Sequence, residues 1–191
     1  YEKKTVKTTN YLEKLKLKKN DYLLFLGRIV PEKRVEWLIQ AYTELKLQQQ
    51  LVIAGGMLHD VGYFSKIRQL IAKNTNIIFT DYIFGQEKEE LLANCSLLVL
   101  PSQVEGYALV VMEALAYSRK VLLPDLIVYK QLFGQKNLFK TASYDDFKNS
   151  LAKILQKRNY SYKAIYPQLL PKQAFLQAYT AVLTNLLKSS R

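Results

Sequence analysis

The stretch PSQVEGYALVVMEALA, residues 101–116, joins a short apolar run at residues 97–100 to a helical pattern over residues 107–118. A continuous apolar run of this length is typical of a strand that is buried on both faces of a sheet. Similar runs occupy residues 22–26, 51–54, 76–80 and 120–123. The stretch therefore predicts one strand–loop–helix unit among several along the chain.

Helical patterns separate these apolar runs. One stripe has the i, i+3, i+4, i+7 spacing of a buried helix face and consists of Val35, Leu38, Ile39, Tyr42 and Leu45. Further helices are expected at residues 63–73, 86–93, 144–157 and 172–188. Strands that alternate with helices form a parallel sheet with helices on both faces. The sequence therefore predicts the α/β class.

Charged residues and glycines stand where two of the predicted strands end. Gly27, Arg28 and Lys33 follow the first strand, and Glu105 and Gly106 follow the fourth. In an open parallel sheet, ligands bind outside the carboxyl ends of the strands, near the point where the strand order reverses. Two cations and the free N–H groups of a helix N-terminus attract phosphate. We therefore expect an anionic ligand in a crevice between these two segments.

Two carboxylates of the opening stretch, Glu105 and Glu113, lie eight residues apart. Where that interval is helical, eight residues rise about 12 Å along the axis. The two side chains are therefore expected to hold hydroxyls on two separate rings of one extended ligand. A pair of solvated surface acids is the alternative, and the neighbouring Gly106 and Arg28 disfavour it.

Together, the Gly-Arg-x4-Lys pattern at residues 27–33 and the Pro-Ser-x2-Glu-Gly-x6-Glu-Ala pattern at residues 101–114 resemble a known family. They are similar to the C-terminal, donor-binding domain of family 4 retaining glycosyltransferases, and the resemblance covers about residues 21–187. It implies a Rossmann-like parallel sheet sandwiched by helices, which forms one half of a GT-B fold. It also implies a nucleoside-diphosphate sugar as the donor substrate, with no separate cofactor and no metal.

The resemblance further implies roles for the matching residues. Arg28 and Lys33 match the cations that neutralise the donor diphosphate, and Glu105 matches the carboxylate that meets the donor sugar. These three are the expected catalytic residues, whereas Glu113 matches the carboxylate that binds the ribose diol. The other expected contacts to the sugar and phosphates are Gly27, Gly106, Tyr107, Ala108 and Leu109. The expected neighbours of the nucleobase are Asp81, Tyr82 and Ile83.

Two departures from the family pattern follow the helix at residues 107–118. Ser118 stands where similar proteins have glycine, at a helix end that favours a positive φ. The segment at residues 124–129 lacks the glycine-rich stretch that usually precedes the next helix. Both departures bear on sugar selectivity more than on the fold.

The expected organisation is one nucleotide-sugar-binding domain over residues 21–191, preceded by a basic linker or leading helix at residues 1–20. A complete GT-B enzyme has an N-terminal domain with the acceptor site, and nothing here resembles that half. We therefore expect a fragment, or a separate donor-binding polypeptide, that is inactive alone. The whole enzyme would transfer a sugar to an acceptor in polysaccharide or cell-envelope glycan synthesis. The alternative is a non-catalytic partner subunit or binding module that retains the glycosyltransferase fold.

Composition excludes several other kinds of site. The single cysteine, Cys95, excludes an internal disulfide, and the single histidine, His59, gives no support for a zinc site. No apolar stretch approaches the ~20 residues needed to span a bilayer. We therefore expect a cytoplasmic protein without a structural metal.

The net charge of +12 is concentrated at the two ends of the chain. Residues 1–19 carry seven lysines, and residues 147–191 carry eight Lys or Arg and no acid. Basic flanks of this kind attract anionic lipid or nucleic acid. The 14 tyrosines form no RNA-binding motif, so nucleic acid is not an expected partner. Peripheral contact with the anionic inner face of the membrane is the expectation, and a simply solvated surface is the alternative.

Overall fold

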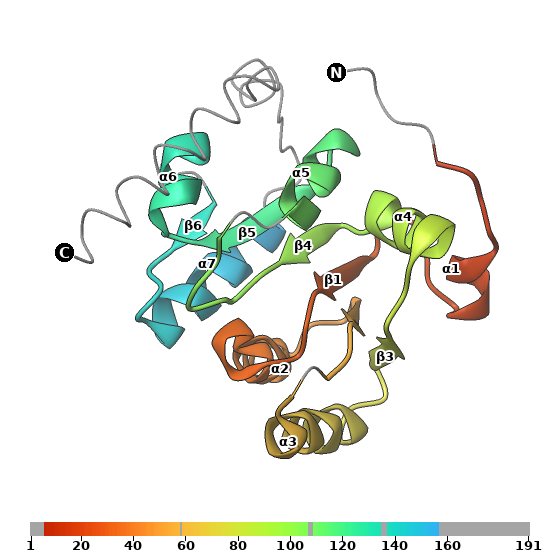
Figure 1. Cartoon of the computed structure of the whole chain (residues 1–191), viewed down its shortest axis with the longest axis horizontal. Coiled ribbons are helices and arrows are strands. Elements are labelled where there is room, and N and C mark those ends of the chain that lie inside the picture. The colour runs from red at the N-terminus through yellow and green to blue at the C-terminus, as the bar shows by residue number, and fades with distance from the viewer. Residues whose placement is uncertain (1–5, 58, 107–108, 135–136, 157–191) are drawn as a thin grey trace.

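A parallel sheet forms the centre of the protein. The computed structural model describes residues 6–57, 59–106, 109–134 and 137–156. The strands are β1 Tyr22–Leu26, β2 Gln50–Ala54, β3 Ile77–Asp81, β4 Leu97–Val99, β5 Lys120–Pro124 and β6 Leu138–Phe139. They pair in the order β3-β2-β1-β4-β5-β6, and every neighbouring pair is parallel (Figure 1). The five strands expected from the sequence are confirmed to within one residue at each end.

Helices cover both faces of this sheet. They are α1 Tyr11–Lys14, α2 Val35–Glu44, α3 Val61–Ala72, α4 Gly85–Asn94, α5 Leu109–Ala116, α6 Ile127–Phe133 and α7 Tyr144–Gln156, with a short 3-10 helix, η1, at Pro31–Lys33. Helix α2 contacts α3 and α7, whereas α4 contacts α1 and α5. In Figure 1, α2 and α3 lie below the sheet and α4 and α5 lie above it. The arrangement is the expected Rossmann-like α/β sandwich.

The central strands are apolar because both of their faces are covered. All five residues of β1 and all three of β4 are buried. Four residues of the predicted stripe on α2, Val35, Leu38, Ile39 and Tyr42, are buried, whereas the fifth, Leu45, is the C-cap and is only partly buried. Burying this apolar surface is the main favourable term in folding. It also fixes the positions at which the loops leave the sheet.

The strand order reverses between β1 and β4. Leu23 pairs with Leu97 and Leu24 pairs with Leu98, so the two strands run side by side. The chain leaves β1 toward α2 and leaves β4 toward α5, and these two helices lie on opposite faces of the sheet (Figure 1). The loops after the two strands therefore diverge and leave a crevice between them, as the sequence predicts.

The leading segment packs on the domain instead of extending from it. Tyr11 and Leu12 of α1 are buried. Glu90 of α4 is also buried, and its Oε2 accepts hydrogen bonds from the backbone N–H groups of Thr9 at 2.9 Å and Tyr11 at 3.1 Å. Burial opposes ionisation of Glu90, but a hydrogen bond from the Thr9 hydroxyl, together with these two backbone bonds, prevails, and the pKa of Glu90 lies below the ordinary value. Glu90 thus anchors the entry segment to α4.

The region after β5 differs most from the sequence-based prediction. Helix α6 and strand β6 were not expected, because their apolar patterns are short. Asp125 organises this region, since its Oδ1 accepts hydrogen bonds from the Thr141 N–H at 2.9 Å and hydroxyl at 2.7 Å. Ser118 has a φ of 58°, which confirms the left-handed position expected after α5. The helix expected at residues 172–188 and most of the basic flank at residues 147–191 lie outside the described residues.

Candidate functional site

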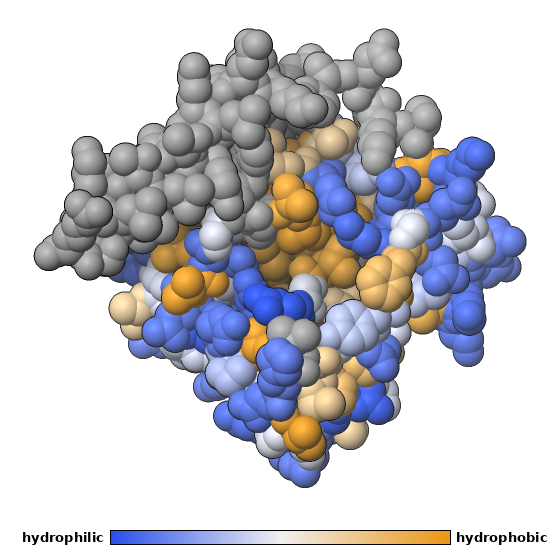
Figure 2. All heavy atoms as spheres, in the orientation of Figure 1, coloured by the Kyte–Doolittle hydropathy of each residue, from blue (hydrophilic) through white to orange (hydrophobic). Residues whose placement is uncertain are grey.

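A cavity of about 420 Å³ opens at the crevice between the ends of β1 and β4. Its floor is apolar and includes Phe25, Leu26 and Leu100. Figure 2 shows the hollow near the middle of this face, with hydrophobic residues on its floor and hydrophilic residues on parts of its margin. Ligand sites are commonly of this size and have a few polar groups around an apolar surface.

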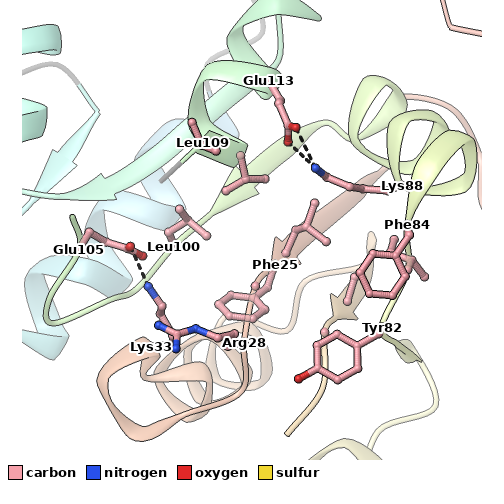
Figure 3. A pocket seen from close by; sticks show the side chains of 16 residues that line it. Phe25, Arg28, Lys33, Tyr82, Phe84, Lys88, Leu100, Glu105, Leu109 and Glu113 are labelled. Carbon is pink, nitrogen blue, oxygen red and sulfur yellow. Dashed lines mark hydrogen bonds and ion pairs between the residues drawn. The ribbon is translucent and has the colours of Figure 1, made fainter. Parts of the chain in front are cut away.

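One end of the cavity carries Arg28 and Lys33, which follow β1. Lys33 is the last residue of η1, and its backbone N–H donates a 2.9 Å hydrogen bond to the carbonyl of Val30. The next residue, Arg34, takes a left-handed conformation with a φ of 47°, which lets the chain turn into α2. The side chains of Arg28 and Lys33 both line the cavity, and Figure 3 shows them on the same side of it. The expected cation pair is therefore assembled at the carboxyl end of β1.

Glu105 approaches this end from the loop after β4. Its Oε2 lies 2.7 Å from the Lys33 Nζ, and its Oε1 accepts a 2.6 Å hydrogen bond from the hydroxyl of the fully buried Ser102. The side chains of Lys33 and Glu105 are 13% and 7% exposed. A backbone bond from the Gln103 N–H to the Glu32 carbonyl, at 2.7 Å, ties the two loops together. The sequence placed both charges at one crevice but did not predict that they pair.

Glu113 lies at the opposite side of the cavity, one turn along α5 from Leu109 (Figure 3). The Nζ of Lys88, on α4, lies 2.8 Å from each of its carboxylate oxygens. Both residues line the cavity. Lys88 is the fourth residue of α4 and stands among Glu87, Glu89 and Glu90. A cation near a helix N-terminus is unfavourable, and that is the one sequence signal that sets Lys88 apart.

Two aromatic side chains form another part of the rim. Tyr82 and Phe84 stack with their ring centroids 6.1 Å apart and their planes 15° from parallel, and both are exposed. The Tyr82 hydroxyl donates a 2.8 Å hydrogen bond to the Met57 carbonyl. Asp81 turns the chain here with a φ of 59°, and its Oδ1 accepts from the Tyr82 N–H at 2.8 Å. Flat, exposed aromatic faces at a cavity rim suit a planar heterocycle.

Glycines allow the backbone to approach closely at the cavity floor. Gly55 has a φ of 146°, and a Cβ at this position would lie 1.7 Å from the carbonyl oxygen of Gly27. At Gly56, a Cβ would lie 2.2 Å from the Tyr82 ring. At Gly106, by contrast, no heavy atom of the described structure lies within 4 Å of the Cβ position. Gly55 and Gly56 therefore serve packing, whereas Gly106 borders open space.

The structure brings most of the predicted site residues to one cavity. Those that line it are Gly27, Arg28, Lys33, Tyr82, Ile83, Glu105, Leu109 and Glu113. Gly106 follows Glu105 in the same loop, Asp81 shapes the turn instead of lining the cavity, and Tyr107 and Ala108 lie outside the described residues. Sequence reasoning missed Phe84 and Lys88. An exposed aromatic residue between a strand end and a helix start was the available signal for Phe84.

The described part of the chain contains no group of three or more His, Cys, Asp or Glu side chains that could hold a metal ion. His59 is exposed, and Cys95 is buried, which raises the pKa of its thiol to about 12. The charged chemistry of the cavity therefore rests on two lysines, one arginine and two carboxylates. Within the same described residues, no helix is long and apolar enough to cross a membrane.

The fold and this site define a class of protein, the Rossmann-like α/β domains with a ligand-sized cavity where the strand order reverses. The family model described as Glycosyl transferases group 1 matches residues 7–167. The chain therefore belongs to this glycosyltransferase family. The expected resemblance to donor-binding domains of the GT-B fold is confirmed at the level of family and fold.

Two curated relatives agree with this assignment. An uncharacterized glycosyltransferase of Methanocaldococcus jannaschii is 29% identical over 125 residues, which are 60% of this chain and 34% of that protein. The O-antigen chain mannosyltransferase B of Escherichia coli is 27% identical over 154 residues, which are 76% of this chain and 39% of that protein. The chain therefore spans well under half the length of the relatives it matches.

Solved structures show the same architecture. The crystal structure of Anabaena Alr3699/HepE in complex with UDP-glucose matches with a TM-score of 0.67 at 17% identity. The match covers 78% of this chain and 44% of that one. At this level of identity the comparison supports the shared fold and leaves the ligand of this chain to be argued from its own cavity.

Proposed function

We propose that this chain is the donor-binding domain of a retaining glycosyltransferase that uses a nucleoside-diphosphate sugar. The observation that carries the proposal is the set of side chains around the cavity at the strand-order reversal. It has Arg28 and Lys33 at one side, Glu113 at the other, and Tyr82 with Phe84 on the rim (Figure 3). A diphosphate, a ribose and a base are linked in that order in a nucleotide, so the three kinds of side chain match its three parts.

The charged residues suggest how the domain assists transfer. Negative charge develops on the diphosphate as it leaves the sugar, and fixed cations beside it stabilise that charge. Arg28 and Lys33 would supply the cations, and no metal is needed for this task. Lys33 is paired with Glu105 in the structure, and Ser102 keeps the Glu105 carboxylate in place. Glu105 would then accept hydrogen bonds from hydroxyls of the donor sugar.

The donor domain is proposed to act with a second domain that carries the acceptor site. Names of relatives point to the product, since one is an O-antigen chain mannosyltransferase. We therefore propose a role in the synthesis of a polysaccharide or other cell-envelope glycan, and mannose is the first sugar to test. The stereochemical part of the proposal is tested by assigning the anomeric configuration of the product by NMR, where inversion would contradict it.

A thermal-shift screen tests donor binding directly. The ligands are UDP, GDP and ADP together with their glucose and mannose conjugates, each with and without EDTA. A ligand at 100 times its dissociation constant stabilises the folded state by about 2.7 kcal/mol. We expect one base to be preferred and EDTA to leave its effect unchanged. If no nucleotide binds, the alternative of a non-catalytic partner subunit that retains the fold is favoured, and if binding requires magnesium the metal-free clamp is wrong.

Substitution of the two carboxylates separates their proposed roles. Glu113→Gln should weaken binding of every nucleoside diphosphate, because it removes a charged acceptor from the ribose. Glu105→Gln should weaken binding of the nucleotide sugar more than binding of the bare nucleoside diphosphate. A hydrogen bond to a charged group contributes about 1.5 to 3 kcal/mol. Calorimetric titration measures both, and dissociation constants that all stay within twofold would contradict the two assignments.

Gly106→Ala tests whether the loop backbone approaches the ligand. No described heavy atom lies within 4 Å of the added methyl group, so the free protein should keep its stability. A bound sugar or phosphate that lies against this backbone would meet the methyl group. We therefore expect weaker nucleotide-sugar binding at unchanged melting temperature, whereas unchanged binding would remove Gly106 from the site.

We also propose that the protein is cytoplasmic and that the basic ends of its chain contact the anionic inner face of the membrane. Each Lys or Arg near an anionic surface contributes about 1 kcal/mol of attraction. Co-sedimentation with neutral and anionic liposomes at low and high salt tests the contact. Equal recovery on both kinds of vesicle would refute it without affecting the donor site.

A further inference from the structure

Lys88 changes the charge of the cavity. The other charged residues that line it are Arg28, Lys33, Glu105 and Glu113, so the sequence-based site has two cations and two carboxylates. With Lys88 included, the described residues that line the cavity comprise three cations and two carboxylates. Such an excess favours an anionic ligand, and it arises from a residue that belongs to neither of the two motifs.

The contact between Lys88 and Glu113 also has a specific geometry. A single Nζ lies 2.8 Å from both carboxylate oxygens, and the two side chains come from different helices, α4 and α5 (Figure 3). A carboxylate has about four acceptor positions. The ammonium group donates a hydrogen bond to Oε1, which keeps a further acceptor position, whereas Oε2 is buried and makes no hydrogen bond with the described residues. The remaining acceptor position of Oε1 suits a hydroxyl of a ribose.

A second cavity explains why Glu113 needs to be held. This smaller cavity, of about 220 Å³, lies between α4 and α5, and Lys88 and Glu113 line it as well as the donor cavity. The ion pair is therefore part of the wall between the two spaces. Glu113 is 39% exposed, and a long unpaired side chain retains several rotamers. Without the ammonium group, the carboxylate has a second space into which it can turn.

We propose that Lys88 is a positioning residue that holds the Glu113 carboxylate toward the ribose diol of the bound nucleotide and so determines selectivity for ribonucleotides over 2′-deoxyribonucleotides. This inference rests on the proposed donor-binding function. Lys88 acts through Glu113, since its ammonium group donates a hydrogen bond to Oε1 and forms an ion pair with the carboxylate. A direct contact of Lys88 with phosphate is the competing explanation, and it predicts no dependence on the 2′-hydroxyl.

Calorimetric titration with paired ligands distinguishes these two explanations. The ligands are UDP, GDP and ADP and their 2′-deoxy counterparts, and the proteins are the wild type, Lys88→Met and Lys88→Arg. In Lys88→Met we expect affinity for the preferred ribonucleotide to fall about tenfold, the loss of about one hydrogen bond. Affinity for its 2′-deoxy counterpart should fall less than threefold. Lys88→Arg keeps two donors and a charge, so it should retain most of the selectivity.

Two controls make the outcomes decisive. Lys66→Met removes an exposed lysine from α3, outside the cavity, and should leave both affinities unchanged. Melting temperatures of all variants show whether the fold is retained, and Lys88→Arg provides a second test if Lys88→Met is unstable. The proposal for Lys88 would be overturned if Lys88→Met lost equal affinity for the ribonucleotide and the deoxyribonucleotide, or if it retained the selectivity between them. Neither result would overturn the donor-binding function. A wild-type protein that binds none of the nucleotides would overturn the donor-binding function and this inference together.

Discussion

Removing the charge of Glu105 should lower the free energy of unfolding by about as much as removing the charge of its partner Lys33. The Nζ and Oε2 atoms are 2.7 Å apart, and the side chains are 13% and 7% exposed. Glu105→Gln keeps an oxygen that can accept the Ser102 hydrogen bond, so the change isolates the charge. Lys33→Met keeps most of the aliphatic stem. The two variants therefore remove the same interaction from opposite sides.

The burial of the pair sets the expected magnitude. Exposed ion pairs contribute about 0.2 to 1 kcal/mol, whereas loss of one partner from a fully buried pair costs about 3 to 5 kcal/mol. This pair is nearly buried but borders an open cavity, so we expect each single variant to lose about 2 kcal/mol, close to the value of a hydrogen bond to a charged group. For a chain of this size, that loss lowers the melting temperature by about 4 to 8 °C.

Urea unfolding of the wild type, both single variants and the double variant measures the coupling. The double variant should be no less stable than either single variant, because removing the second partner relieves the uncompensated charge. The coupling free energy should therefore be about 2 kcal/mol. If the single losses simply add, within about 0.5 kcal/mol, the inference from burial is wrong and the two charges act independently.

Substitutions at three further positions test other features of the fold. Gly55→Ala should lower the free energy of unfolding in urea by about 3 kcal/mol or more, because its Cβ would lie 1.7 Å from the Gly27 carbonyl oxygen at a φ of 146°. A free energy of unfolding within about 1 kcal/mol of the wild-type value would show that this close approach is incorrect. Ser118→Gly should raise the free energy of unfolding by about 0.5 to 1 kcal/mol, because the φ of 58° strains a residue with a Cβ. Ser118→Ala keeps this strain, so its free energy of unfolding should not rise in the same assay. Burial opposes ionisation of Asp125, but hydrogen bonds from Thr141 and the ion pair with Lys130 outweigh it and lower the Asp125 pKa from 3.8 to about 2. Its contribution to stability, about 1 to 2 kcal/mol, is therefore complete above about pH 4 and lost as the pH falls through 2, so acid unfolding of Asp125→Asn should show a weaker pH dependence than the wild type over this range.

The sequence predicted the central sheet and the position of the crevice with few errors. Residues 22–26 and 97–100 are continuous apolar runs because both faces of these strands are covered, and that pattern is local in the sequence. The charged residues that follow them were expected at one sheet edge, since the carboxyl ends of parallel strands meet there. The short helix α6 and strand β6 were missed because their apolar patterns are too short to show a period.

Tertiary structure decided how the charges in the cavity are partnered. Lys33 and Glu105 are 72 positions apart, and Lys88 and Glu113 are 25 positions apart, so neither contact follows from spacing within one helix or strand. Each depends on the angle at which a loop or helix leaves the sheet, and packing of many apolar side chains sets that angle. The amino-acid sequence alone therefore determined which strand ends carry charge, because burial imprints a local apolar pattern. Which carboxylate each lysine meets was settled only by the folded packing, because it joins segments that the local pattern does not relate.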